Sequence, residues 1–390
     1  MPRAARIVDA HCCPAHCERP IVPPASLDVW IGGRPAARLG DFIACWPPNV
    51  IIEGSESVHI NGRPAARRGD ASAHGGRIKE GEPTVLIGQS SSQAKRARLA
   101  QRQALIANAR ASSIASPSLL AAADRLEFNN KAVEHARLSE SVYGACCAPV
   151  GWTRLTGDDL PEALRDERIW SDDESGFYAA LYRSDDGEIV LAFRGTENGR
   201  DWRKANIPQG LGLESEQYTA ANTLARAVQR AYGPGVRTTG HSLGGGLATL
   251  ASVSTGMLAT VFNPAALHRK TAARVGADVA AADSQVDAVI VRGEILTTAQ
   301  DYTPLPDARG RRHYVQAGDS MLGAAIKGAR MGSTVGSMVG PKGRVAGAVV
   351  GAAVAVGMES YDRHGMDHVI EGIEAQKSAD IETLQRAPWE

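Results

Sequence analysis

A serine with the surroundings of a nucleophile stands at position 242. The pattern G-x-S-x-G is matched by Gly240-His241-Ser242-Leu243-Gly244. In this pattern a strand turns sharply into a helix, and the serine hydroxyl is exposed on a strained backbone. Side chains in place of the two glycines would collide with neighbouring backbone. Residues 235–239 can form the strand and residues 245–252 the helix, so the spacing predicts nucleophilic catalysis by Ser242.

A serine nucleophile needs a base and an acid, and candidates for both follow along the chain. In folds with this motif the order is serine, carboxylate, histidine. Glu294 follows the strand-like run 286–291 and is the predicted acid, with Asp301 as the alternative. His364 stands just before a C-terminal helix and is the predicted base. His368, one turn into that helix, is the alternative, because a catalytic histidine belongs on a loop above the nucleophile.

Donors for the oxyanion that forms in acyl transfer are expected at the end of a strand. The strand-like run 189–193 is followed directly by Arg194-Gly195-Thr196. Thr196 can supply its backbone N–H and its hydroxyl, and Leu243, the residue after the nucleophile, can supply a second N–H. We therefore expect Thr196 and Leu243 to bind the oxyanion, although 194–196 could also be an ordinary strand-end turn.

Cysteines and histidines near the N-terminus suggest a metal site. Four of the six cysteines lie in the first 45 residues. Cys13, Cys45 and His74 each stand four residues after an aspartate of a repeated unit, and His16 completes a C-x-x-H pair with Cys13. Two thiolates and two imidazoles are a ligand set that structural Zn²⁺ prefers, so we expect zinc on these four residues. Substitutes for the fourth ligand lie close in sequence: His11, Cys12 and Cys17.

The unit that carries these ligands is repeated. Residues 28–41 return as residues 57–70, and partial copies stand at 5–9 and 84–88. Each unit has an alternating strand, a glycine-containing turn and a second short strand that ends at Gly-Asp. One unit of about 29 residues cannot bury its own apolar face. We therefore expect three units to pack around a pseudo-threefold axis.

Two Pro-Ala-Ala-Arg tetrapeptides, at 35–38 and 64–67, make residues 1–90 resemble a PAAR domain. That family forms a small, all-β, conical tip on the trimeric spike of the type VI secretion system, with a metal near its apex. The resemblance implies that the four predicted ligands hold zinc and that the base of the cone sits on the spike protein. The first repeat departs from the pattern, because no Pro-Ala-Ala-Arg precedes Asp9.

The elements that must position Ser242 also resemble a family. Strands are expected at 176–182 and 189–193. Phe193-Arg194-Gly195-Thr196, Asp201-Trp202, the motif at 240–244 and Val261-Phe262-Asn263-Pro264 together resemble the class 3 lipases, over about residues 130–385. The resemblance implies an α/β-hydrolase fold, hydrolysis of lipid esters and a mobile lid, at about 198–215 in this chain. Class 3 lipases usually have aspartate where this chain has Glu294.

Length and composition predict a multidomain chain without nucleic-acid partners. The 390 residues suggest a repeat domain at 1–90, a polar, helix-tolerant linker at 91–117 and an α/β-hydrolase domain at 118–390. Lys+Arg 43 equals Asp+Glu 43, so binding to nucleic acid is not expected. No signal-peptide run follows the first residues, and no run of about 20 apolar residues occurs. We expect synthesis in the cytoplasm and export by another route.

A glycine-rich insertion is expected at 319–358. Glycine recurs every fourth residue from Gly328 to Gly340 and again from Gly343 to Gly351. On helices this spacing places small residues on one stripe, where helices can approach closely. We interpret the insertion as a helical hairpin that either packs tightly within the protein or enters a membrane.

Together these features predict an antibacterial type VI effector. A spike-tip module would carry a phospholipase A that cleaves phospholipid esters in the envelope membranes of a target cell, and the resemblance to such effectors implies an immunity protein in the producer. One alternative is a structural tip whose C-terminal domain forms pores through the glycine-rich hairpin. A second alternative is an esterase that acts on small soluble acyl esters.

Overall fold

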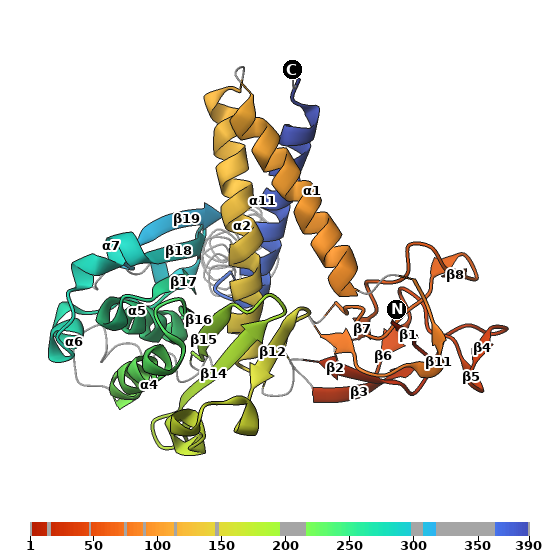
Figure 1. Cartoon of the computed structure of the whole chain (residues 1–390), viewed down its shortest axis with the longest axis horizontal. Helices are drawn as coiled ribbons and strands as arrows, with labels where there is room; N and C mark the ends of the chain where they lie inside the picture. Colours follow the sequence, from red (N-terminus) through yellow and green to blue (C-terminus); the bar gives the residue numbers. More distant parts are fainter. Residues whose placement is uncertain are drawn as a thin grey trace, which may run out of the picture.

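The protein was analysed as a computed structural model. It describes residues 2–13, 17–46, 48–73, 76–88, 91–112, 115–144, 148–195, 216–297, 307–316 and 363–388. We call residues 2–88 the repeat region and residues 115–388 the α/β region. Helix α1 (Ser91–Ala111) lies between them in the chain (Figure 1).

The repeat region is built from short antiparallel strands. One sheet has five strands in the order β10 (Arg77–Ile78), β2 (Ala10–Cys13), β3 (Cys17–Val22), β6 (Phe42–Ile43) and β7 (Asn49–Val50). Three further strand pairs are β1 (Arg3–Ala4) with β11 (Glu82–Leu86), β4 (Trp30–Ile31) with β5 (Arg34–Pro35), and β8 (His59–Ile60) with β9 (Arg63–Pro64). The last of these turns at Asn61 and Gly62, whose φ angles of 52° and 76° are those of a type I′ hairpin. The hairpin predicted from Asn61-Gly62 is therefore confirmed.

A ring of backbone hydrogen bonds closes the three repeats on one another. The N–H of Ala5 donates to the carbonyl of Ala66, that of Ala37 to Ala5 and that of Ala66 to Ala37, each at 2.9 Å. The three alanines are buried, with 0%, 0% and 1% of their surface exposed. The predicted pseudo-threefold packing is confirmed.

Each repeat also contains the same arginine–aspartate turn. The backbone N–H of the arginine donates to the aspartate Oδ2 three residues later, at 2.8 Å for Arg6, 2.8 Å for Arg38 and 2.7 Å for Arg67. The first repeat, which lacks Pro-Ala-Ala-Arg, keeps Ala-Ala-Arg at 4–6 and so makes the same contact. Its departure from the tetrapeptide therefore leaves the local structure unchanged.

The α/β region is organised around an eight-stranded sheet. Seven strands follow the order β12 (Trp152–Leu155), β14 (Phe177–Ser184), β15 (Ile189–Phe193), β16 (Arg237–His241), β17 (Leu258–Phe262), β18 (Val286–Val291) and β19 (Arg311–Val315), and β13 (Ser171–Asp172) pairs with β14. The strands from β15 to β19 are parallel, and the pairs that β14 forms are antiparallel. The strands expected near 176–182, 189–193 and 286–291 are confirmed.

Helices cover both faces of this sheet (Figure 1). One face carries α4 (Glu216–Tyr232), α5 (Leu243–Thr255), α6 (Arg269–Arg274) and α7 (Ala282–Gln285), and the other carries α2 (Pro117–Ser141) and α11 (Met366–Arg386). Short 3₁₀ helices are η1 (Gly157–Asp159), η2 (Glu162–Leu164), η3 (Glu167–Ile169) and η4 (Val279–Ala281). Successive residues of β18 alternate between the faces: Ala288 and Ile290 pack with α4 and α5, whereas Val289 and Val291 pack with α2 and α11. A strand buried on both sides explains this continuous apolar run.

Residues 91–111 differ from the expected solvated linker. Ile106 and Ala109 of α1 are buried against Leu126 of α2 and Leu384 of α11. A few apolar positions suffice for this contact because two neighbouring helices already offer an apolar groove. The domain limits at residues 90 and 117 stay a prediction.

The described helices are all too short or too polar to cross a bilayer. The glycine-rich insertion predicted at 319–358 lies outside the described residues, apart from the question of where it begins and ends.

Candidate active site

Ser242 stands at the turn between β16 and α5. Its backbone has φ 56° and ψ −123°, an unfavourable conformation for a residue with a side chain. A Cβ on Gly240 would lie 2.3 Å from the carbonyl oxygen of Gly244, and one on Gly244 would lie 2.2 Å from that of Phe193. The requirement for both glycines of the motif is therefore confirmed.

Three of the predicted site residues meet at this turn. His364 Nε2 lies 2.9 Å from Ser242 Oγ, and His364 Nδ1 lies 2.7 Å from Glu294 Oε2. The two contacts span 122 and 70 residues of sequence. Exposed fractions are 5% for Ser242, 0% for Glu294 and 8% for His364. The structure thus places a hydroxyl, an imidazole and a carboxyl in one buried line.

Glu294 is held as an ionised acceptor just beyond β18. The backbone N–H of Leu296 donates to its Oε2 at 2.8 Å, and that of Thr297 donates to its Oε1. Burial raises the pKa of Glu294, but the bonds from His364 and Thr297 outweigh it and lower the pKa overall. An ionised carboxylate accepts from N–H, so Nδ1 of His364 carries the hydrogen and Nε2 is left to face Ser242.

Asn263 fixes the backbone of His364, a role that the sequence analysis does not give it. Its Nδ2 donates to the carbonyl oxygen of His364 at 3.1 Å, and its Oδ1 accepts the N–H of Val291 at 2.9 Å. The residue is fully buried and has a φ of 39°, which asparagine tolerates better than most residues. One side chain therefore links the histidine loop to the strand that precedes Glu294. Its place in the matched run 261–264 was the available signal.

The remaining predicted residues have mixed outcomes. Leu243 begins α5, where the first backbone N–H groups have no partner within the helix. His368 lies in the first turn of α11, and its Nδ1 is 3.8 Å from Oε2 of Glu371. Thr196, Asp301 and the expected lid at 198–215 lie outside the described residues. The choice of Glu294 and His364 therefore rests on contacts that are present, without a comparison to Asp301.

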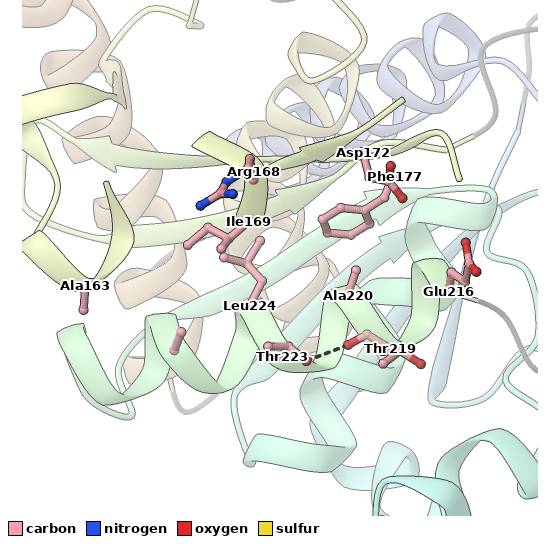
Figure 2. A pocket seen from close by; sticks show the side chains of 11 residues that line it. Ala163, Arg168, Ile169, Asp172, Phe177, Glu216, Thr219, Ala220, Thr223 and Leu224 are labelled. Atoms are coloured by element: carbon pink, nitrogen blue, oxygen red, sulfur yellow. Dashed lines mark hydrogen bonds between the residues drawn. The ribbon is translucent and has the colours of Figure 1, made fainter. Parts of the chain in front are cut away.

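A pocket of about 770 Å³ lies beside this site, between α4, β14 and η3 (Figure 2). Ile169 and Phe177 lie on one side of it, opposite Ala220 and Leu224 of α4. Charged and hydroxyl side chains also line it: Arg168, Asp172, Glu216, Thr219 and Thr223. The ring of Phe177 packs against that of Phe193, with 6.3 Å between centroids. The pocket thus adjoins the strand whose end contacts Gly244.

Two of the predicted metal ligands meet in the repeat region. The thiols of Cys13 and Cys45 lie within hydrogen-bonding distance of one another, and Cys13 is fully buried. Burial, together with the neighbouring Cys13, raises the pKa of the Cys45 thiol to about 11. Such a pair suits a cation that stabilises thiolates. His16 and His74 lie outside the described residues, and within those residues no three ligand side chains gather.

Cys12 has a different role from the one considered for it. It forms a disulfide, so in this form it is not a substitute metal ligand. The spacing of the cysteines gave no sign of this bond, because Cys12 and Cys13 are adjacent and only their orientation on β2 separates their roles.

Comparison with known proteins gives two family matches. Residues 134–360, more than half of the chain, match the Tle-like phospholipase domain, and residues 14–80 match the PAAR motif. Extracellular phospholipase A1 of Serratia liquefaciens is 37% identical over 179 residues, which cover 44% of this chain and 56% of that protein. The chain thus matches about half the length of this relative. It belongs to the Tle-like phospholipase family and carries its phospholipase domain behind an N-terminal PAAR motif.

Proposed function

We propose that the α/β region is an α/β-hydrolase that cleaves carboxylic esters of phospholipids. The observation that carries this proposal is the unbroken line of contacts from Ser242 Oγ through the His364 ring to Glu294, in a chain that matches a phospholipase family. A nucleophile, a base and a group that orients the base are the set that acyl transfer requires.

The proposed reaction has two steps. Ser242 Oγ attacks the ester carbonyl while His364 Nε2 takes its proton, and Glu294 stabilises the imidazolium that results. The N–H of Leu243 and the predicted donors of Thr196 bind the oxyanion. His364 then gives the proton to the departing lysophospholipid alcohol. Water, deprotonated by His364, cleaves the acyl-enzyme, releases the fatty acid and restores Ser242.

The pocket beside α4 supports a substrate with an acyl chain. Its volume of about 770 Å³ falls in the range of ligand pockets, and apolar side chains supply much of its wall. Phe177 connects it to the strand next to the nucleophile turn. The name of the Serratia relative, a phospholipase A1, favours the sn-1 ester as the bond cleaved.

We further propose that the repeat region caps the trimeric spike of a type VI secretion system. The PAAR match and the pseudo-threefold ring of Ala5, Ala37 and Ala66 support this, since a threefold surface can seat on a trimer. Cys13 and Cys45, with His16 and His74, would hold a structural Zn²⁺. Delivery would bring the phospholipase to the envelope membranes of a competing bacterium, and a cognate immunity protein would protect the producer.

Vesicles of phosphatidylethanolamine and phosphatidylglycerol test the enzymatic part. Purified full-length protein should release fatty acid and lysophospholipid, and Ser242→Ala should reduce the rate about 10⁶-fold. Ser254→Ala, on the same helix, removes a hydroxyl that bonds only to the carbonyl of Ala251 among described groups and is the matched control. Leakage of the vesicles by wild type and Ser242→Ala alike, without lipid cleavage, would instead support the pore-forming alternative.

Metal analysis tests the zinc site. We expect one zinc ion per chain in protein purified without chelator, and less in Cys45→Ser. Release of zinc should lower the thermal stability of the repeat region, because the energy of metal binding contributes to folding. Full occupancy in both Cys45→Ser and Cys13→Ser would mean that the ion, if present, is held elsewhere.

A further inference from the structure

A chain of hydrogen bonds leads from the end of β15 to the loop that carries His364. The N–H of Gly195 donates to Tyr143 Oη at 3.0 Å. Tyr143 Oη lies 3.1 Å from His241 Nδ1, and His241 Nε2 lies 2.7 Å from the carbonyl oxygen of His364. Three segments that are remote in sequence are thereby connected behind the nucleophile turn.

The direction of each bond in this chain is fixed by its ends. A carbonyl oxygen only accepts, so Nε2 of His241 carries the hydrogen. In a neutral imidazole Nδ1 is then the acceptor, and it receives the hydroxyl hydrogen of Tyr143. Tyr143 Oη in turn accepts from Gly195. Each group uses one donor and one acceptor, and reversing any bond would leave two hydrogens facing each other.

Burial keeps His241 in this state. Only 8% of its surface is exposed, and burial together with the adjacent His364 lowers its pKa to about 3. The two imidazole rings lie 4.8 Å apart between centroids. His241 therefore stays neutral across the range in which His364 must gain and lose a proton.

The space around Gly195 shows how closely these groups are packed. A Cβ on Gly195 would lie 2.3 Å from Tyr143 Oη and 2.7 Å from the carbonyl oxygen of His241. At the other end of the chain, the carbonyl of His364 accepts from both His241 and Asn263, which uses both of its lone pairs. Neither end can move without breaking a bond to the network.

We propose that Tyr143 and His241 are positioning residues that hold the β15 end and the His364 backbone in register around Ser242. Neither side chain is assigned contact with substrate. Tyr143 reaches the site from just beyond α2, so the helix layer under the sheet takes part in setting the active geometry. This inference rests on the proposed role of Ser242 as nucleophile.

Removal of the Tyr143 hydroxyl tests the proposal in the full-length protein. In Tyr143→Phe, kcat for vesicle phospholipid should fall about 10- to 100-fold with KM unchanged, as expected for a small misplacement of reacting groups. The rate at which a fluorophosphonate labels Ser242 should fall by a similar factor. The matched control is Tyr182→Phe, which removes the hydroxyl of a buried tyrosine that bonds to Ser141 instead. It should retain both rates.

Variants of His241 provide a second, graded test. A glutamine can place an N–H near the position of Nε2 and still reach the carbonyl of His364, whereas alanine cannot. His241→Gln should therefore retain more labelling rate than His241→Ala. If the two residues act in one chain, the double variant Tyr143→Phe/His241→Gln should label no more than about twice as slowly as the slower single variant.

The labelling measurement separates this inference from the proposed substrate. Wild-type rates of labelling in Tyr143→Phe would overturn the positioning role whether or not phospholipid is cleaved. If wild type is labelled but cleaves no phospholipid, the proposed function fails, and the ratio of labelling rates still decides the inference. Independent effects of the two substitutions, multiplying in the double variant, would also overturn it.

Discussion

The repeat region and the α/β region solve the problem of holding a precise geometry in opposite ways. In the repeat region one contact occurs three times: the ring of Ala5, Ala37 and Ala66 and the three arginine–aspartate turns distribute the load over equivalent positions. In the α/β region each contact at the site occurs once, between residues as far apart as Ser242 and His364. Symmetry therefore offers redundancy to the one region, and the other has none.

The sharpest test of this contrast is a substitution at a contact without a copy. In Glu294→Gln the amide can donate to Nδ1 of His364 and favours the wrong tautomer, so kcat should fall about 10⁴-fold, or about 5.5 kcal/mol in the barrier. Steady-state kinetics on phospholipid vesicles would measure this. Glu371→Gln, on the exposed side of α11, is the control and should keep wild-type kcat. A loss of less than tenfold in Glu294→Gln would return attention to Asp301.

The next largest effect is expected at one of the three copies. Within the described residues Asp70 forms an ion pair with Arg67 alone, and both are buried. Burial already raises the pKa of Asp70, so Arg67→Ala would leave a costly carboxylate and destabilise the region by about 3–5 kcal/mol. Asp41 has Arg63 at 2.9 Å besides Arg38, so Arg38→Ala should cost clearly less.

Hydrogen exchange can follow both variants, because it reports the local free energy of opening in the repeat region of the full chain. Equal losses in Arg67→Ala and Arg38→Ala would mean that the three positions are energetically equivalent and that the second cation adds nothing. The phospholipase rate should stay unchanged in both variants.

The same contrast explains what the sequence could and could not predict. The repeat was visible because equivalent contacts come from equivalent residues, as in Arg38 and Arg67. The meeting of Ser242, Glu294 and His364 could be expected because each stands at the end of a strand or at a helix start on one edge of a parallel sheet. The positions of Tyr143, His241 and Asn263 were not predicted.

Those three residues act through backbone carbonyls and amides, which have no signature in side-chain type. The contact of Tyr143 with His241 spans 98 residues, and that of Asn263 with His364 spans 101. The packing of α1 was missed for a related reason: its narrow apolar stripe has meaning only beside α2 and α11. Such tertiary contacts need the fold before they can be recognised.

A smaller effect is expected where the α/β region meets its substrate. Ala220→Phe places a ring in the pocket beside α4, so the rate on long-chain phospholipid should fall about tenfold relative to a short-chain ester. Ala231→Phe makes the same change on an exposed face of α4, outside the pocket, and should leave the ratio unchanged. An unaltered chain-length preference in Ala220→Phe would place the acyl chain elsewhere.

The smallest effect concerns pH, and it again involves a residue of α2 that has no copy. Burial and the nearby Asp367 raise the pKa of Glu140 from its ordinary 4.5 to about 7. The unfolded chain therefore releases this proton first, and the stability of the folded protein falls as pH rises from about 4.5 to about 7. Glu140→Gln should raise the free energy of unfolding by about 1–2 kcal/mol at pH 8 and change little at pH 4.5, in urea denaturation. Glu127→Gln, on the exposed face of the same helix, should show no such growth across this range. A pH-independent gain in Glu140→Gln would mean that the side chain, and not its charge, is poorly accommodated, and the α/β region would then resemble the repeat region in its response to pH.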